Sequence, residues 1–140
     1  GNMILYKQKC ANCDLEIISK EDGESKCLIC EQGKYITTGN ISINNLTLNP
    51  VTFETKDDTG RTVEITVEPC GKVTKSETRV FELDEYYPLQ VFQETILGVN
   101  SLPDAKENVY YILPKHQARL VPNRTDVLFV NNKDKKLYKS

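Results

Sequence analysis

Hydrophobic and polar residues alternate over much of the chain after residue 35, the pattern typical of strands that bury one face. The alternation is clearest in Val51–Thr55 and again in Thr62–Glu68. The polar segment 56–61 between them contains Gly60, so these segments predict a hairpin with a glycine-containing turn. Further along, we expect a strand at Arg79–Leu83 and continuation of the sheet over Val91–Leu97.

The C-terminal part combines an apolar run with a short helical signal. Val109–Leu113 is rich in residues that favour strands and predicts a central strand. Pro114 and Pro122 flank residues 115–121, which predicts a helix of about two turns, because proline is favoured at a first helical position and cannot continue a helix. Residues 126–130 and 136–139 then predict a last hairpin.

Four cysteines near the N-terminus carry the strongest motif in the chain. Cys10, Cys13, Cys27 and Cys30 form two Cys-x2-Cys pairs separated by 13 residues. Two residues between ligands allow a tight turn to direct both thiolates at one ion, and two such turns complete a tetrahedral zinc site. We expect residues 15–17 and 26–28 to form the arms of a short hairpin around a polar turn at 20–24, as in a zinc ribbon.

Two other interpretations of these cysteines remain open. Each Cys-x2-Cys pair is also compatible with a redox dithiol, although no thioredoxin-like βαβ pattern is adjacent, and two structural disulfides would suit a secreted protein. We favour a structural Zn²⁺, because four thiolates leave no open position for catalysis. The fifth cysteine, Cys70, is expected to be a small, partly buried residue.

Together these patterns predict an α+β, mainly β protein in two parts. A zinc ribbon-like segment spans residues 3–34, and a β-rich ligand-binding domain with one or two short helices spans 35–140. The 140-residue length suits this organisation. No apolar run approaches the ~20 residues that span a membrane. The lack of an export signal and the paired thiols favour the cytoplasm.

Charge and motifs narrow the classes of function. The net charge is −2 and the pI near 5.5, so a nucleic-acid partner is not expected. No nucleophile elbow, phosphate-binding loop or dinucleotide fingerprint occurs. The single histidine, His116, falls in the predicted helix and has an ordinary surface role as its simplest interpretation. We therefore do not expect an enzyme.

A binding site is better supported. Arg79 begins a predicted strand, and Arg124 lies in a loop beside a sheet end, where a guanidinium can grip a phosphate. Asp126, two residues from Arg124, can hold that guanidinium. Phe92 can stack on a base, and Asn100 can bond its edge. The competing interpretation is a surface salt bridge and ordinary core rings.

The order of several segments resembles a family of small phage and bacterial proteins, the phage anti-Thoeris signal sponges. The resemblance spans residues 41–140 and is carried by Asn45–Thr52, Pro69–Val73, Arg79–Val80, Leu97–Pro103, Val109–Leu113 and Arg124–Phe129. The sequence departs from the family pattern at three places. The family's histidine after a proline is absent where Leu48–Pro50 stands, Cys70 replaces a serine, and Tyr111–Pro114 stands for a segment that ends in serine in the family. The cysteine-rich segment is an addition to that pattern.

This resemblance implies a function and a partner. It implies a cytoplasmic homo-oligomer that sequesters a small phosphorylated nucleotide ligand, such as a cyclic ADP-ribose isomer or a cyclic oligonucleotide, without cleaving it. Arg79, Arg124 and Asp126 match the family's polar positions. The alternative function is a zinc-ribbon adaptor that binds a protein or nucleic acid through the ribbon surface, and a nucleotide hydrolase is a third possibility.

Overall fold

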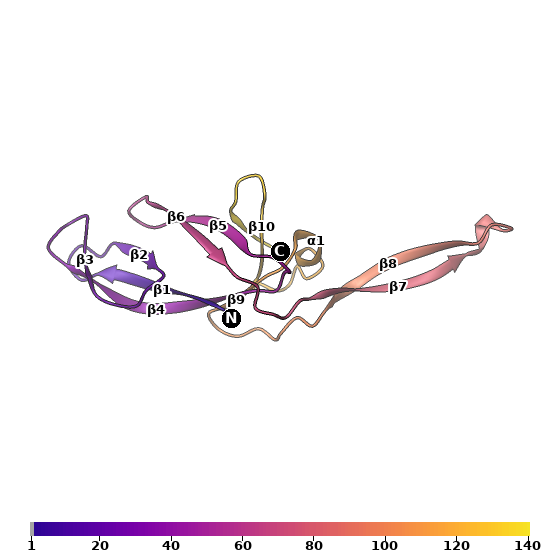
Figure 1. The fold of residues 1–140 in the computed structure, drawn as a ribbon, viewed down its shortest axis with the longest axis horizontal. Helices are drawn as coiled ribbons and strands as arrows, with labels where there is room; N and C mark the ends of the chain where they lie inside the picture. Colours follow the sequence, from indigo (N-terminus) through magenta and orange to yellow (C-terminus); the bar gives the residue numbers. More distant parts are fainter. Residues whose placement is uncertain (1) are drawn as a thin grey trace.

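The computed structural model describes residues 2–140 and has an elongated shape, with the cysteine-rich segment at one end and a long hairpin at the other (Figure 1). A seven-stranded mixed sheet forms its body, in the order β11-β10-β9-β4-β1-β2, with β3 paired to β4. The strands are β1 (Met3–Cys10), β2 (Glu16–Ser19), β3 (Ser25–Lys26), β4 (Lys34–Asn45), β9 (Val109–Ile112), β10 (Val127–Val130) and β11 (Leu137–Lys139).

Two hairpins lie outside this sheet. One pairs β5 (Val51–Lys56) with β6 (Thr62–Val67), and the other pairs β7 (Lys75–Leu83) with β8 (Val91–Asn100). Both are inserted between β4 and β9, which are parallel neighbours in the sheet. The helical segments are the 3-10 turn η1 (Asp84–Tyr86) and the single-turn helix α1 (Lys115–Ala118). The prediction of an α+β, mainly β fold with one or two short helices is therefore confirmed.

Most predicted elements are present, with two differences. The predicted helix over 115–121 shortens to one turn, because Val121 and Arg124 already belong to a turn closed by the bond from the Arg124 N–H to the Val121 carbonyl. The predicted hairpin between 15–17 and 26–28 is wrong. β2 pairs with β1 and β3 pairs with β4, because each knuckle turn folds the two strands that it joins against each other.

Two apolar cores hold the body together. The first lies between the sheet and the β5–β6 hairpin and comprises Leu5, Ile43, Phe53, Ile65, Val67 and Ile112. The second packs β9 and β10 against α1 and comprises Leu46, Tyr111, Leu113, Ala118, Val127 and Phe129. Alternate residues of each strand enter these cores, which explains the period of two in the sequence.

A buried asparagine joins the end of β4 to the β5–β6 hairpin. Asn45 is fully buried, and its amide nitrogen donates to the carbonyls of Asn49 and Val67 at 2.8 and 3.0 Å. Its amide oxygen accepts from the Thr47 N–H and hydroxyl at 2.9 and 2.6 Å. Every polar atom of this side chain is paired, so its burial carries no unsatisfied group.

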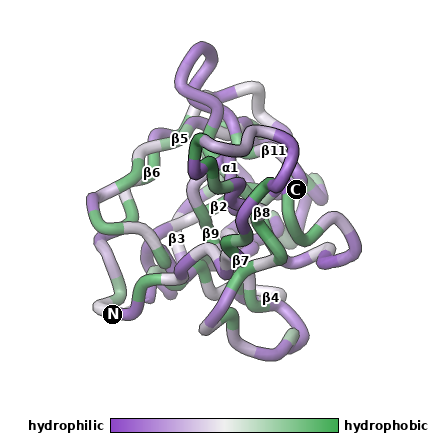
Figure 2. Tube along the Cα trace, turned by 90° about the vertical axis from the view of Figure 1, so that its right-hand side faces the viewer, coloured by the Kyte–Doolittle hydropathy of each residue, from purple (hydrophilic) through white to green (hydrophobic). Residues whose placement is uncertain are grey.

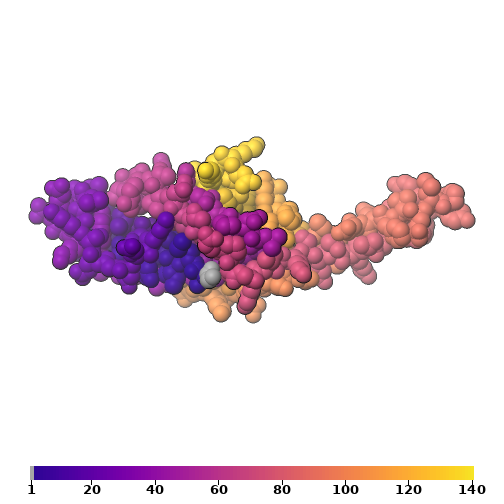
Figure 3. All heavy atoms as spheres, viewed as in Figure 1, coloured from indigo at the N-terminus to yellow at the C-terminus, as the bar shows by residue number. Residues whose placement is uncertain are grey.

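The β7–β8 hairpin, which we call the arm, projects from the body without a layer on either face (Figures 1 and 3). At ~3.3 Å per residue, its nine-residue strand β7 spans about 30 Å. Figure 2, viewed from the arm's side, shows hydrophobic stretches along β7 and β8 as well as in the body. Among the described residues, none of the helices is long and apolar enough to cross a membrane.

Candidate metal centre and the predicted ligand residues

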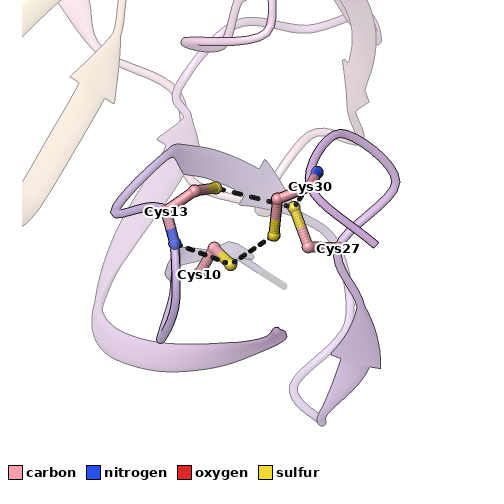
Figure 4. Close-up of side chains that lie close together, drawn as sticks. All are labelled: Cys10, Cys13, Cys27 and Cys30. Carbon is pink, nitrogen blue, oxygen red and sulfur yellow. Dashed lines mark hydrogen bonds between the residues drawn. The ribbon is translucent and has the colours of Figure 1, made fainter. Parts of the chain in front are cut away.

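The four cysteines converge on one point (Figure 4), at the end of the molecule opposite the arm (Figure 1). Cys10 and Cys13 come from the turn between β1 and β2, and Cys27 and Cys30 from the turn between β3 and β4. Their four sulfur atoms lie within 4.8 Å of one another. The Cys10 and Cys30 sulfurs are 3.6 Å apart, and the Cys13 and Cys27 sulfurs 3.8 Å.

These distances fit one tetrahedral metal ion. Zn–S bonds of about 2.3 Å place tetrahedral sulfurs roughly 3.8 Å apart. A disulfide requires about 2.05 Å, and all five cysteines of the described chain are free thiols. The four cysteines therefore lie close enough to hold a metal ion, and the donor set of four thiolates suits Zn²⁺ in a closed, structural site.

The two knuckle turns repeat the same backbone geometry. In the first, the Asp14 N–H donates to the Cys10 carbonyl, and in the second the Glu31 N–H donates to the Cys27 carbonyl, each at 3.1 Å. Asp14 and Glu31 both adopt left-handed backbone conformations, with φ of 65° and 58°. This conformation turns the chain away directly after the second cysteine of each pair, which leaves both sulfurs facing inward.

Backbone N–H groups surround the sulfurs and favour thiolates. The N–H groups of Asn12 and Cys13 donate to the Cys10 sulfur at 3.4 Å, and the Cys30 N–H donates to the Cys27 sulfur at 3.5 Å. The Gln32 N–H and the Asn12 amide lower the pKa of Cys30 to about 6. The Cys30 N–H likewise lowers the pKa of Cys27. Hydrogen bonds to the charged form are the cause in both cases.

Close packing of the thiols acts in the opposite direction at Cys13. The Leu15 N–H lowers its pKa, but burial and the neighbouring sulfurs outweigh that effect and raise the pKa to about 12. Cys27 also raises the pKa of the Tyr35 hydroxyl to about 12. Several thiolates this close together repel one another, and a divalent cation at their centre removes that repulsion.

Three residues around the cysteines were not singled out by the sequence motif. Gly33 is required by close approach: a Cβ there would lie 2.7 Å from both the Cys10 sulfur and the Asn12 Cβ. Asn12 contributes its side-chain amide to the Cys30 sulfur at 3.6 Å. Tyr35 packs in the same buried cluster as Cys10, Cys27 and Ile17. The only signal in the sequence is the glycine three residues after Cys30.

An apolar cavity adjoins the second knuckle. It has a volume of about 340 Å³ and is lined by Leu28, Ile29, Ile17, Tyr35 and the turn Thr59–Arg61. Leu28 lies between the two cysteines of the knuckle and is 75% exposed. The cysteine end thus presents apolar surface beside the candidate metal site.

The predicted pair Arg124 and Asp126 is in contact, within the body. The Arg124 Nε and a terminal nitrogen each donate to one Asp126 oxygen at 2.8 Å, and that terminal nitrogen also donates to the Pro103 carbonyl at 2.7 Å. The Arg124 bond lowers the pKa of Asp126, and the carboxylate raises the pKa of Arg124. The salt bridge thereby ties the segment that follows β8 to the start of β10.

The remaining predicted ligand residues lie on the arm. Asn100 pairs with Lys75 at its root, Arg79 pairs with Thr95 partway along, and Phe92 pairs with Glu82 near its tip. All three side chains are exposed. The register separates Phe92 from Asn100 by eight residues, or about 26 Å. The structure therefore brings Arg124 and Asp126 together but spreads Arg79, Phe92 and Asn100 along the arm.

A second polar pair holds the arm root, and sequence inspection did not find it. Thr74 and Gln117 are both buried, although they are 43 residues apart. The Thr74 hydroxyl donates to the Gln117 amide oxygen at 2.5 Å, and the Gln117 amide nitrogen donates to the Thr74 carbonyl at 3.4 Å. Val99, on the other strand of the arm root, packs against the second core.

Comparison with protein families, with curated proteins and with solved structures found no match to this chain.

Proposed function

We propose that the protein is a non-enzymatic assembly protein that associates with further copies of itself through the arm, while a structural zinc ion held by Cys10, Cys13, Cys27 and Cys30 stabilises the opposite end. The carrying observation is the exposure of large apolar side chains along the whole arm. Val80 pairs with Glu94, and residues two apart on a strand point to the same side, so Val80 lies on the same face as Phe92 and Ile96. All three side chains are exposed.

A hairpin that packs against no other element has little stability of its own in water. Two strands without a third strand or a packed face are marginally stable, and contiguous exposed apolar surface marks an interaction site. The arm root, in contrast, is firmly held by the Thr74–Gln117 pair and the Arg124 bond to Pro103. A well-anchored base with uncovered faces is what an association element requires, because little order is lost on binding.

Sequestration of a nucleotide-derived signal stays a prediction from the sequence resemblance. Its phosphate-binding residues Arg79 and Arg124 lie on the arm and in the body, and Arg124 is already paired with Asp126. Native mass spectrometry with cyclic ADP-ribose isomers and cyclic oligonucleotides tests it directly. Intact ligand retained by the wild-type protein and lost in Arg124→Ala would replace assembly with sequestration as the best-supported function.

The ribbon adaptor is a second candidate, favoured by the cavity beside Leu28 and Ile29. An adaptor would bind its protein or nucleic-acid partner through the second knuckle, so Leu28→Ser would abolish association with that partner. If the protein assembles through the arm, Leu28→Ser leaves association between copies of the chain unchanged, since the arm lies at the other end of the molecule (Figure 1).

Light scattering of the purified protein over a range of concentrations tests the assembly proposal. We expect wild type to exceed the 15.9 kDa of one chain and Val80→Ser/Phe92→Ser to remain monomeric. Ile4→Ser/Ile36→Ser is the matched control, because these residues are exposed apolar side chains outside the arm. A second variant replaces residues 77–98 with Asn-Gly and closes the Ser76–Val99 pair, which keeps the contact of Val99 with the second core. A monomeric wild type at every concentration would overturn the proposal.

A further inference from the structure

A groove opens on the body between the loop after β4, the start of α1 and the turn between β10 and β11. Its volume is about 480 Å³. Apolar side chains line its inner part, and Lys115 and Lys133 line it as well. The apolar lining residues are Val51, Ile112, Leu113, Pro114 and Val130. The groove therefore combines an apolar interior with cationic groups.

The turn beside the groove is strongly basic. Lys133, Lys135 and Lys136 are all exposed, and the single acid of the turn, Asp134, accepts a hydrogen bond from the Tyr138 hydroxyl, which lowers its pKa. A further groove of about 270 Å³ is lined by Lys56 and Lys136, with Glu54 as its acid. Lysines outnumber acids on this side of the body, so an acidic, apolar segment is the complementary occupant.

The arm tip has that composition. Glu82, Asp84 and Glu85 are exposed acids, and no basic residue occurs between Val80 and Asn100. Tyr87 and Leu89 lie in the loop that connects β7 to β8, and they are 87% and 70% exposed. Tyr87 alone offers an aromatic area of the size that dominates protein interfaces, ~150–250 Å².

The tip of one chain does not reach the groove of the same chain. The arm projects away from the body, and β10 lies in the body near the arm root (Figures 1 and 3). The root is held by the buried Thr74–Gln117 pair, and the regular β7–β8 register leaves no break at which the arm could fold back, apart from the irregularity at Glu77/Thr78 near the root. A tip that meets this groove must come from another copy.

We infer that the acidic, apolar tip of the arm, residues 82–92, docks into the lysine-lined groove of a second copy of the chain. This rests on the proposed function and adds the receiving surface. The contact is heterologous, because tip and groove are different surfaces of the same chain. Successive copies therefore join head to tail into a closed ring or an open filament.

The test uses complementary charge reversal in the full-length protein. Glu82→Lys/Asp84→Lys reverses the tip, and Lys115→Glu/Lys133→Glu reverses the groove. We expect each variant alone to associate at least about tenfold more weakly than wild type, about 1.4 kcal/mol, and an equimolar mixture of the two to recover association. Lys20→Glu/Lys106→Glu is the control, because it makes the same charge change at exposed lysines outside the groove.

Sedimentation velocity separates the outcomes. Recovery in the mixture supports docking of the tip in the groove. If the tip variant is monomeric but the groove variant associates as wild type does, the groove is wrong while arm-mediated assembly stands. If wild type is monomeric, the assembly proposal itself fails. Association of wild type should also weaken between about 0.1 and 1 M salt, where the Debye length falls from roughly 10 to 3 Å.

Discussion

The two ends of this molecule are both built from hairpins, and they are held in opposite ways. At the cysteine end the strands β2 and β3 have four and two residues, and the buried cluster is dominated by cysteines. At the arm end the strands have nine and ten residues in almost continuous register, and none of their side chains is buried. Neither end can rely on an apolar core of its own.

This contrast shows two solutions to one physical problem. A region too small to bury enough apolar surface needs another source of stability. At the cysteine end four thiols surround a point that suits a metal ion, so the stabilising group lies inside the region. The arm leaves its apolar side chains on the outside, where only another molecule can cover them.

Removal of the metal should give the largest difference between the two ends, because it should unfold the cysteine end and leave the arm folded. Binding of zinc to four thiolates contributes on the order of 10 kcal/mol to folding of such sites. We therefore expect a strong chelator, or Cys27→Ser, to unfold residues 10–34 locally. In two-dimensional NMR the amide signals of this segment should lose their dispersion, while those of the arm stay in place. Unchanged signals near the cysteines would refute a structural metal.

Substitution of Gly33 sharpens the same contrast with a single methyl group. The new Cβ of Gly33→Ala would meet the Cys10 sulfur and the Asn12 Cβ at 2.7 Å. We expect a loss of about 3 kcal/mol in unfolding free energy by denaturant titration, together with weaker zinc retention. Gly39→Ala serves as the control, because a Cβ at Gly39 has no neighbour within 4 Å. Equal stability of the two variants would contradict the close packing described here.

The smallest effect concerns the arm root and depends on pH. The pKa of Asp126 is lowered in the folded protein by Arg124. The stabilisation that ionised Asp126 gives to the folded state is therefore fully present at pH values above its unfolded-state pKa of about 3.9. It is lost as the pH falls through the lower pKa of the folded state. We expect Asp126→Asn to reduce the unfolding free energy by about 1.5 kcal/mol at pH 7. The difference from wild type should vanish in strong acid, and a pH-independent difference would exclude this explanation.

The sequence predicted those features that depend on local spacing. Alternation located the β5–β6 hairpin, two short segments around a polar turn located the last hairpin, and the Cys-x2-Cys spacing identified all four residues of the cysteine cluster. In these cases the residues that determine the structure are neighbours in the chain, so a pattern over a few positions is sufficient.

Contacts between distant residues escaped the sequence analysis. The pairing of Thr74 with Gln117 joins residues 43 positions apart, and nothing in either local sequence indicates it. The same holds for the pairing of β3 with β4 instead of β2. Arg79–Leu83 and Val91–Leu97 were predicted as strands of a sheet, but alternation does not reveal whether any layer covers them, which is why the arm was not foreseen.

The insertion point of the arm has a consequence for the adaptability of the fold. The chain leaves the body at Thr74 and returns after Asn100, which pairs with Lys75. The arm is therefore joined to the body through two adjacent strand ends. The arm strands pair only with each other, so the seven-stranded sheet has the same hydrogen bonds whichever hairpin is inserted at this point. The protein is thus suited to exchange of modules, and hairpins of other lengths grafted between Ser76 and Val99 should fold on an unchanged body, because Val99 keeps its contact with the second core.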